Sequence, residues 1–211
     1  QPKWRTVNAL GQLIQLQEVG LCGTDACAST STGTTQYDYD PFGNLRYVQD
    51  YKGNVTRLHH DVRGRKIAMD DPDLGHWEYE YNALGELLKQ WDAKTGRNTV
   101  VSPAVNPTVA PVVTLEYDIL GRLHKRTEPE GLTTWTYDTA PGAAKGPLAH
   151  VTSPGQYRRA HTYDTLGRLI RTRTTLGSKS YDEDIGYDAL SRVQVLSYPE
   201  TSPGQRLKVY H

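Results

Sequence analysis

The sequence lacks the periodic pattern of helices and the long apolar runs of membrane spans. No stretch of its 211 residues keeps an apolar period of 3.6 residues for three turns, whereas Thr, Tyr and Val are frequent. No apolar run approaches the roughly 18 residues that a membrane-spanning helix requires. Counting glycine but not tyrosine, apolar residues make up about 38% of the chain, below the roughly 45–50% usual for globular domains. These absences argue against a helical fold and favour an extended, two-faced sheet over a compact core.

The sequence also has no excess of charge of either sign and very few cysteines. Lys and Arg together number 24, as do Asp and Glu, so no general electrostatic force draws the chain to nucleic acid or to an anionic membrane. The two cysteines, Cys22 and Cys27, are too few for an all-cysteine zinc site with four ligands within this chain. Their spacing suits a small disulfide loop in an exported protein, and two free thiols are the alternative.

Recognisable catalytic and cofactor-binding motifs are absent from the sequence. It contains no Gly-x-Ser-x-Gly, no phosphate-binding loop and no paired-histidine helix. His59 and His60 are adjacent residues of a predicted strand, so their side chains point to opposite faces and do not readily share a metal ion. We therefore predict no catalytic residue, no metal site and no cofactor, and we expect that the chain is not an enzyme.

What the sequence does contain is a short motif that returns along the chain: Tyr-Asp, two variable residues, Gly, a polar residue and Leu. In the second copy Asn replaces Asp, and in the last one Ser191 replaces the glycine. Such self-similarity is typical of repeat architectures. Clear copies occupy residues 39–45, 81–87, 117–123 and 163–169, and weaker copies occupy 7–13, 60–66 and 187–193.

The spacing of the motif supports a single repeat region. Gly43, Gly64 and Gly85 follow one another at intervals of 21 residues, and Gly121 and Gly142 are again 21 residues apart. The irregular gaps are insertions, which we place at about residues 17–36 and 97–112. We predict one repeat region over residues 1–211, and we expect it to be a piece of a longer repeat protein with exposed sheet edges at both ends.

Physically, each copy specifies a β-hairpin. Asp at the first position and Gly at the fourth favour a type I turn closed by a left-handed residue, which gives a hairpin with a G1 bulge. Asp then faces the residue after Gly, and Tyr meets Leu one step outward on the opposite face. Cross-strand pairs of these kinds contribute roughly 0.2–1 kcal/mol each. The predicted turn residues are Asp40, Gly43, Asp61, Gly64, Gly85, Asp118, Gly121, Arg122, Asp164, Gly167, Arg168, Asp188 and Arg192.

The repeated Tyr-Asp-x-x-Gly-Arg-Leu resembles the YD-repeat, or RHS, family over nearly the whole chain, roughly residues 7–210. The resemblance implies an all-β chain of consecutive antiparallel hairpins, wound into a spiral sheet that closes into a hollow shell. In bacterial insecticidal toxin complexes and polymorphic toxins such a shell holds a toxic C-terminal domain before delivery. The chain would then be a section of the wall, with the remaining repeats of the shell and the enclosed toxin as partners. It would be secreted, or delivered by a bacterial secretion or toxin-injection system.

A second hypothesis is a cell-surface module for adhesion or carbohydrate binding, since related shells in animal teneurins serve cell adhesion. In that case exposed tyrosines and the tryptophans Trp77, Trp91 and Trp135 would stack on a glycan. The two hypotheses differ in what they predict. Encapsulation predicts a smooth curved sheet with no deep pocket, whereas glycan binding predicts aromatic residues clustered on one solvent-exposed face.

Overall fold

The chain consists of β-hairpins. The structure, a computed structural model, describes residues 3–19, 32–95, 110–142, 145–202 and 204–211. These residues form 17 strands, and their one helical segment is the three-residue 3-10 helix η1 (Ala93–Thr95). None of their helices is long and apolar enough to cross a membrane. The predicted all-β chain of consecutive antiparallel hairpins is confirmed.

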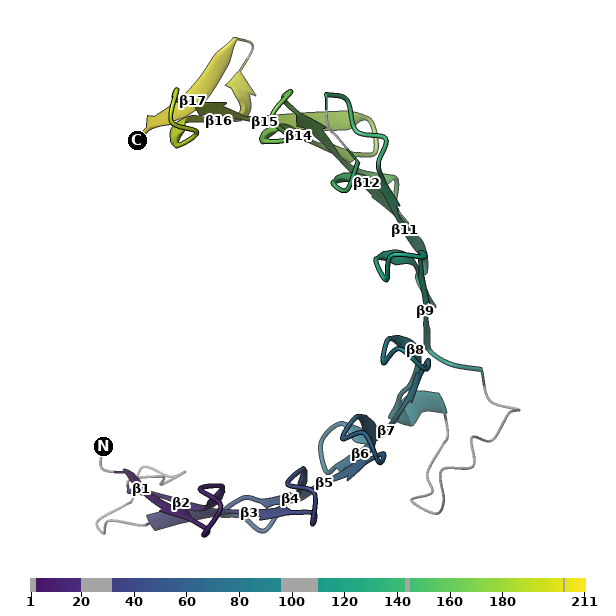
Figure 1. Cartoon of the computed structure of the whole chain (residues 1–211), viewed down its shortest axis with the longest axis vertical. Coiled ribbons are helices and arrows are strands. Elements are labelled where there is room, and N and C mark those ends of the chain that lie inside the picture. Colours follow the sequence, from purple (N-terminus) through teal and green to yellow (C-terminus); the bar gives the residue numbers. More distant parts are fainter. Residues whose placement is uncertain (1–2, 20–31, 96–109, 143–144, 203) are drawn as a thin grey trace. The chain divides into compact units, whose positions relative to one another are not determined.

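The strands belong to two units, Gln1–Val112 and Val113–His211, in each of which every strand pairs with the next one along the chain (Figure 1). Unit 1 contains β1 (Lys3–Val7), β2 (Leu13–Val19), β3 (Thr32–Tyr39), β4 (Leu45–Gln49), β5 (Val55–His60), β6 (Lys66–Asp71), β7 (Gly75–Tyr81) and β8 (Leu87–Trp91). Unit 2 contains β9 (Val113–Tyr117), β10 (Leu123–Glu128), β11 (Gly131–Tyr137), β12 (Leu148–Ser153), β13 (Tyr157–Tyr163), β14 (Leu169–Leu176), β15 (Lys179–Tyr187), β16 (Val193–Ser202) and β17 (Gln205–Tyr210).

The register of the hairpins places each motif tyrosine opposite the motif leucine. His60 pairs in the same way with Lys66, so this hairpin forms although the pair is polar. In each case the register shifts between this pair and the next pair away from the turn, which marks a β-bulge at the same position of these motif hairpins. A bulge bends its strand and increases the local twist. The apolar pairs are Tyr39 with Leu45, Tyr81 with Leu87, Tyr117 with Leu123 and Tyr163 with Leu169.

Because side chains alternate along a strand, each unit has two different faces. We call the face that carries the motif tyrosines and leucines the tyrosine face. The other, the ion-pair face, carries charged residues that pair across neighbouring strands. Exposed pairs of this kind contribute little individually, so their number matters more than any one of them. They include Asp38 with Arg46, Glu80 with Lys89, Glu116 with Lys125, Arg171 with Asp184 and Arg173 with Asp182.

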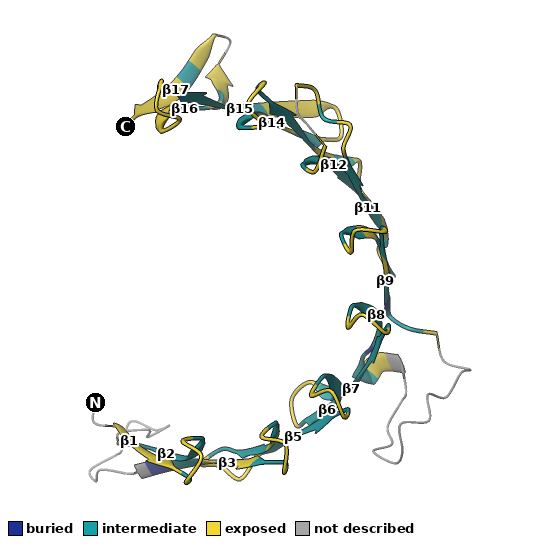
Figure 2. Ribbon diagram, viewed as in Figure 1, coloured by how far each residue is buried: buried dark blue, intermediate teal, exposed yellow. Residues whose placement is uncertain are grey.

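The sheet of each unit is a single layer with little buried core (Figure 2). Among the described residues, the buried apolar side chains are Trp91, Val113 and Ala149, and no large side chain is fully buried. Stability therefore rests on strand hydrogen bonds and cross-strand pairs repeated along the chain rather than on one central core.

The two predicted insertions lie mostly outside the described residues. Strand β2 runs to Val19 and β3 begins at Thr32, so strands occupy both ends of the segment expected at residues 17–36. Cys22 and Cys27 fall in the undescribed part, and their pairing stays a prediction. At the end of the second segment, the Val112 N–H donates to the Gln90 carbonyl at 2.9 Å.

Candidate functional site: the junction between hairpins

The motif turn is held by its own backbone and by the aspartate side chain. In the turn between β9 and β10, the Gly121 N–H donates to the Asp118 carbonyl at 3.0 Å, and the Asp118 N–H donates to the Arg122 carbonyl at 2.9 Å. The Asp118 carboxylate accepts hydrogen bonds from the backbone N–H groups of Leu120 and Arg122, at 2.9 and 3.0 Å. The Arg122 Nε donates to its second oxygen at 2.7 Å. One carboxylate thus accepts hydrogen bonds from the backbone N–H groups that the turn itself leaves unpaired.

The same geometry recurs along the chain. Within the described ranges, eight turns share the two backbone hydrogen bonds, and each begins with Asp or Asn. One of them, Asp50–Asn54 between β4 and β5, lies at the opposite end of the strands and was missed by the sequence analysis. Its signal was present, since Asp50-x-x-Gly53-Asn54 repeats the pattern of the preceding turn without the tyrosine. The turns are Asn8–Gln12, Asp40–Asn44, Asp50–Asn54, Asp61–Arg65, Asn82–Glu86, Asp118–Arg122, Asp164–Arg168 and Asp188–Arg192.

In five of the described hairpins, a tyrosine at the motif position connects the hairpin to the one before it. The Tyr137 hydroxyl donates to the Leu123 carbonyl at 3.0 Å. The ladder between β10 and β11 reaches only as far as Lys125 and Thr134, so this carbonyl lies beyond it. The tyrosine therefore extends the ladder toward the turn. Four further pairs repeat this contact: Tyr39 with Leu13, Tyr81 with Lys66, Tyr163 with Leu148 and Tyr187 with Leu169, at 2.9–3.0 Å.

The arginine after the motif glycine makes a second connection, in the opposite direction along the chain. Besides its own Asp118, Arg122 donates to the Asp138 carboxylate at 2.8 Å and to the Gly146 carbonyl at 3.1 Å, both after β11. Its guanidinium also lies 4.2 Å from the centre of the Tyr137 ring, a cation–π distance. One arginine thus joins its own turn to the tyrosine and the loop of the next hairpin.

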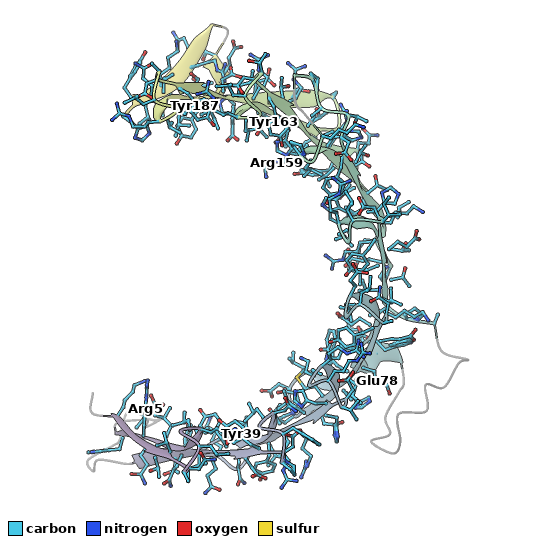
Figure 3. All side chains as sticks on the ribbon, in the orientation of Figure 1. Arg5, Tyr39, Glu78, Arg159, Tyr163 and Tyr187 are labelled. Carbon is cyan, nitrogen blue, oxygen red and sulfur yellow. The ribbon has the colours of Figure 1, made fainter. Side chains whose placement is uncertain are left out.

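Arg65 and Arg168 repeat this arrangement. Arg65 donates to the Asn82 carbonyl at 2.8 Å and stacks on Tyr81. Arg168 donates to the Ser191 hydroxyl at 2.8 Å and stacks on Tyr187. We call the set of tyrosine and arginine contacts between two consecutive motif hairpins a junction (Figure 3 labels Tyr39, Tyr163 and Tyr187).

The junctions predict an order of effects for arginine substitutions. Arg122→Ala removes contacts to Asp118, Asp138, Gly146 and a tyrosine ring, whereas Arg192 pairs with Asp188 alone in the described part of the chain and is largely exposed. We expect the melting temperature to fall most for Arg122→Ala, less for Arg168→Ala and least for Arg192→Ala. Thermal denaturation followed by circular dichroism measures this order. Three equal shifts would show that the contacts between hairpins contribute nothing.

The turn carboxylates are held in their charged form. The hydrogen bond from the Arg122 backbone N–H is the main reason why the pKa of Asp118 lies below its usual value; burial acts against it, and the Arg122 side chain adds to the lowering. The pKa of Asp164 is lowered by the same causes in the same order. For Asp188, the backbone and then the side chain of Arg192 lower the pKa, against burial.

A loss of stability in acid follows from these lowered pKa values. Because the aspartates bind protons less tightly in the folded than in the unfolded chain, their contribution is present above the unfolded pKa, about 3.8, and is lost as the pH falls through the folded pKa. We expect the melting temperature to drop as the pH falls below about 4. Asp118→Asn should reduce that drop. Identical acid profiles for the two proteins would contradict this assignment.

A cluster of histidines and carboxylates occupies the ion-pair face of unit 1. His76 is buried, with Nδ1 2.7 Å from Asp70 and Nε2 3.1 Å from Glu78. His59 Nε2 lies 3.5 Å from the other oxygen of Asp70, whereas His60 belongs to the opposite face. No group of three or more His, Cys, Asp or Glu among the described residues is arranged to hold a metal ion.

The described part of unit 2 includes two open grooves with volumes of about 500 and 190 Å³. At the larger one the register between β16 and β17 shifts between Ser197 and Glu200. The Arg206 side chain donates to the Ser197 carbonyl at 3.0 Å and to the Tyr198 carbonyl at 2.7 Å, and it pairs with Asp184. A structural role accounts for this arginine. The larger groove is lined by Ser180, Tyr181, Asp182, Glu200, Thr201, Ser202 and Arg206.

Trp77 and Trp91 do not form a common platform for stacking a glycan. Trp91 is only 3% exposed. It is in register with Glu78, whereas Trp77 is in register with Met69, so the two side chains belong to opposite faces of unit 1. The Trp77 indole N–H is also occupied, donating to the Leu74 carbonyl at 3.0 Å. This arrangement does not favour the carbohydrate-binding hypothesis.

Comparison with known proteins relates the chain to toxins. No protein-family model matches it. It is 27% identical over 173 residues, or 77% of its length, to double-stranded DNA deaminase toxin A of Burkholderia cenocepacia (strain H111), and it spans 11% of that protein. Among solved structures, TcdB2-TccC3 matches 96% of this chain and 15% of its own at 12% identity, with a TM-score of 0.42. The Tc holotoxin pore of Photorhabdus luminescens matches 94% of this chain and 13% of its own at 15% identity, with a TM-score of 0.32.

The deaminase match corrects one expectation of the sequence analysis. The chain was expected not to be an enzyme, because no converging polar residues or catalytic motif appear in it. The curated relative is by its name a deaminase, and so an enzyme. The absence of a catalytic motif concerns these 211 residues alone, and they span only about a tenth of the relative's length. The expectation is therefore wrong.

Proposed function

We propose that this chain is a section of the wall of a shell that encloses a toxic polypeptide. The observation that carries the proposal is the junction, because at five places in the described chain it bonds one motif hairpin to the next at the edge of the sheet. Arg122, for example, connects two consecutive hairpins through Asp118 and Asp138. A wall needs such lateral continuity, since a gap between two hairpins would expose whatever lies behind it.

The two-faced single layer supports the same proposal. A wall has an inner and an outer face and no thick core, and each unit has a tyrosine face, an ion-pair face and little buried apolar surface. Paired charges and half-buried aromatics let both faces stand in water while the backbone hydrogen bonds remain within the sheet.

The nature of the cargo is part of the proposal. The resemblance to YD-repeat shells and the match to a DNA deaminase toxin together favour a toxic enzyme as the enclosed polypeptide. The remaining repeats of the shell would complete the enclosure, and a bacterial secretion or toxin-injection system would deliver it. Enclosure keeps an active toxin away from the cell that makes it.

The proposal is tested in the parent protein by opening the wall. Deleting one complete motif hairpin, residues 157–178 in unit 2, should make the cargo sensitive to protease and toxic to its producer. The matched control is Arg192→Ala, which removes one exposed ion pair and leaves the hairpins in place. A deletion whose cargo stays protected and harmless would overturn the proposal.

A further inference from the structure

The motif turns carry large apolar side chains at their tips, and these side chains are largely exposed to solvent. In three motif turns of unit 1 the residue before the glycine is apolar: Leu10, Phe42 or Leu84. In the remaining turn, residues 61–65, the apolar residue is Val62, one position earlier. These side chains are between 81% and 94% exposed. Figure 2 shows the turns as exposed loops along the sheet. Unit 2 repeats the pattern at Ile119, Leu120, Leu166 and Leu190.

The turns themselves do not require these residues. Asp and Gly fix the turn through the hydrogen bonds described above, and the two central positions of a type I turn accept most residue types. Single exposed apolar residues are ordinary, but a row at one fixed position of successive turns is not. At the opposite edge the corresponding tips mix polar residues such as Lys52, Asp73, Glu130 and Ser178 with Tyr51 and Leu74, which are 44% and 58% exposed. The unbroken row of strongly exposed apolar tips thus belongs to one edge of the sheet.

We propose that these tips form a docking ridge for a second run of the same hairpins. We call the side chains of Leu10, Phe42, Val62 and Leu84 the tip ridge of unit 1. Successive motif turns are two strands apart, or about 9–10 Å at the usual strand spacing. A partner must present apolar groups at that same interval to meet every tip, and another YD-repeat edge does so. The gap between two tips is wide enough to receive one apolar side chain from an opposing ridge.

The charges around the tips favour the same partner. The four motif turns of unit 1 contain two arginines, Arg63 and Arg65, against three acidic residues, Asp40, Asp61 and Glu86. The ridge therefore offers no surplus of positive charge for nucleic acid or an anionic membrane surface. The remaining driving force for association is the burial of the apolar tip side chains against an opposing ridge of the same kind. This inference concerns an interaction surface and does not depend on which cargo the shell encloses.

The test measures self-association of the 211-residue chain. By sedimentation velocity we expect a reversible dimer, whose dissociation constant should rise at least about a hundredfold in the triple variant Leu10→Ser, Phe42→Ser and Leu84→Ser, since each buried side chain accounts for about tenfold or more. The control, Tyr51→Ser with Leu74→Ser, changes exposed residues of the opposite edge and should leave the dimer unchanged. Unaltered circular dichroism and melting would show that the variants fold.

A second measurement locates the contact. In a background of Cys22→Ser and Cys27→Ser, Leu84→Cys should form disulfide-linked dimers on mild oxidation, whereas Leu74→Cys should not. A chain that stays monomeric, a triple variant that associates like the parent, or equal cross-linking at the two edges would each overturn the proposal.

Discussion

Replacing Gly167 by valine is expected to lower the free energy of unfolding by about 2–3 kcal/mol, because the turn holds this residue in a backbone conformation that β-branched residues rarely adopt. Its φ is +76°, and a Cβ added there would meet no atom within 4 Å. The cost is therefore backbone strain alone and not a steric clash with a neighbour. Urea denaturation of the two proteins gives the difference.

The last motif offers the reverse experiment at the same turn position. Ser191 stands where the other copies have glycine, and its φ is +62°. Ser191→Gly relieves the strain but also removes the hydrogen bond from Arg168, so the reference is Ser191→Ala, which loses the same hydrogen bond and keeps the strain. The glycine variant should be the more stable of the two by about 1 kcal/mol. Equal stabilities of these two variants, or a harmless valine at Gly167, would contradict the left-handed turn as the feature that selects glycine.

Tyr163→Ala is expected to cost about 3 kcal/mol, the second large effect. Tyr163 is half-buried, its ring pairs with Leu169, and its hydroxyl donates to the Leu148 carbonyl at 3.0 Å. Tyr163→Phe keeps the ring and loses only the hydrogen bond, so it should cost about 1 kcal/mol. The control is Tyr210→Ala, at a position that is 71% exposed and near the end of the chain.

These tyrosines also predict an effect at high pH. Burial raises the pKa of the Tyr163 hydroxyl, and burial is likewise the main cause of the raised pKa values of Tyr81 and Tyr137. Their contribution to stability is present below the unfolded pKa of about 10 and is lost as the pH rises through the folded pKa. Tyr163→Phe should therefore weaken the alkaline loss of stability. An equal loss in the variant would show that this hydroxyl is not desolvated by folding.

The hairpins could be predicted from the sequence because their determinants are local. Asp118 and Gly121 fix a turn within four residues, and the period of two then places Tyr117 opposite Leu123 without further information. The junctions could not be predicted in this way. That the Tyr137 hydroxyl reaches the Leu123 carbonyl depends on where the ladder between β10 and β11 stops, which is a property of two hairpins together.

The connection between β11 and β12 shows where the 21-residue spacing misleads. Gly142 follows Gly121 at the repeat interval, but the Asp138 N–H pairs with the carbonyl of Pro147, so the loop is longer than a motif turn. A Cβ on Gly142 would lie 2.0 Å from the Tyr163 carbonyl oxygen. Its left-handed φ of +76° and its close approach to the next hairpin both favour glycine here, and the spacing alone does not distinguish this position from a motif turn.

The wall proposal depends most directly on the claim that junctions couple neighbouring hairpins, and native-state hydrogen exchange measures that coupling. The double variant Arg168→Ala with Tyr187→Phe removes the junction between hairpins β13–β14 and β15–β16, and the control is Arg192→Ala with Tyr210→Phe. If the account is correct, amide protons in both hairpins exchange faster in the junction variant than in the control, including those of β16, which does not pair with β14. Protection in β15 and β16 equal to that of the control would contradict it.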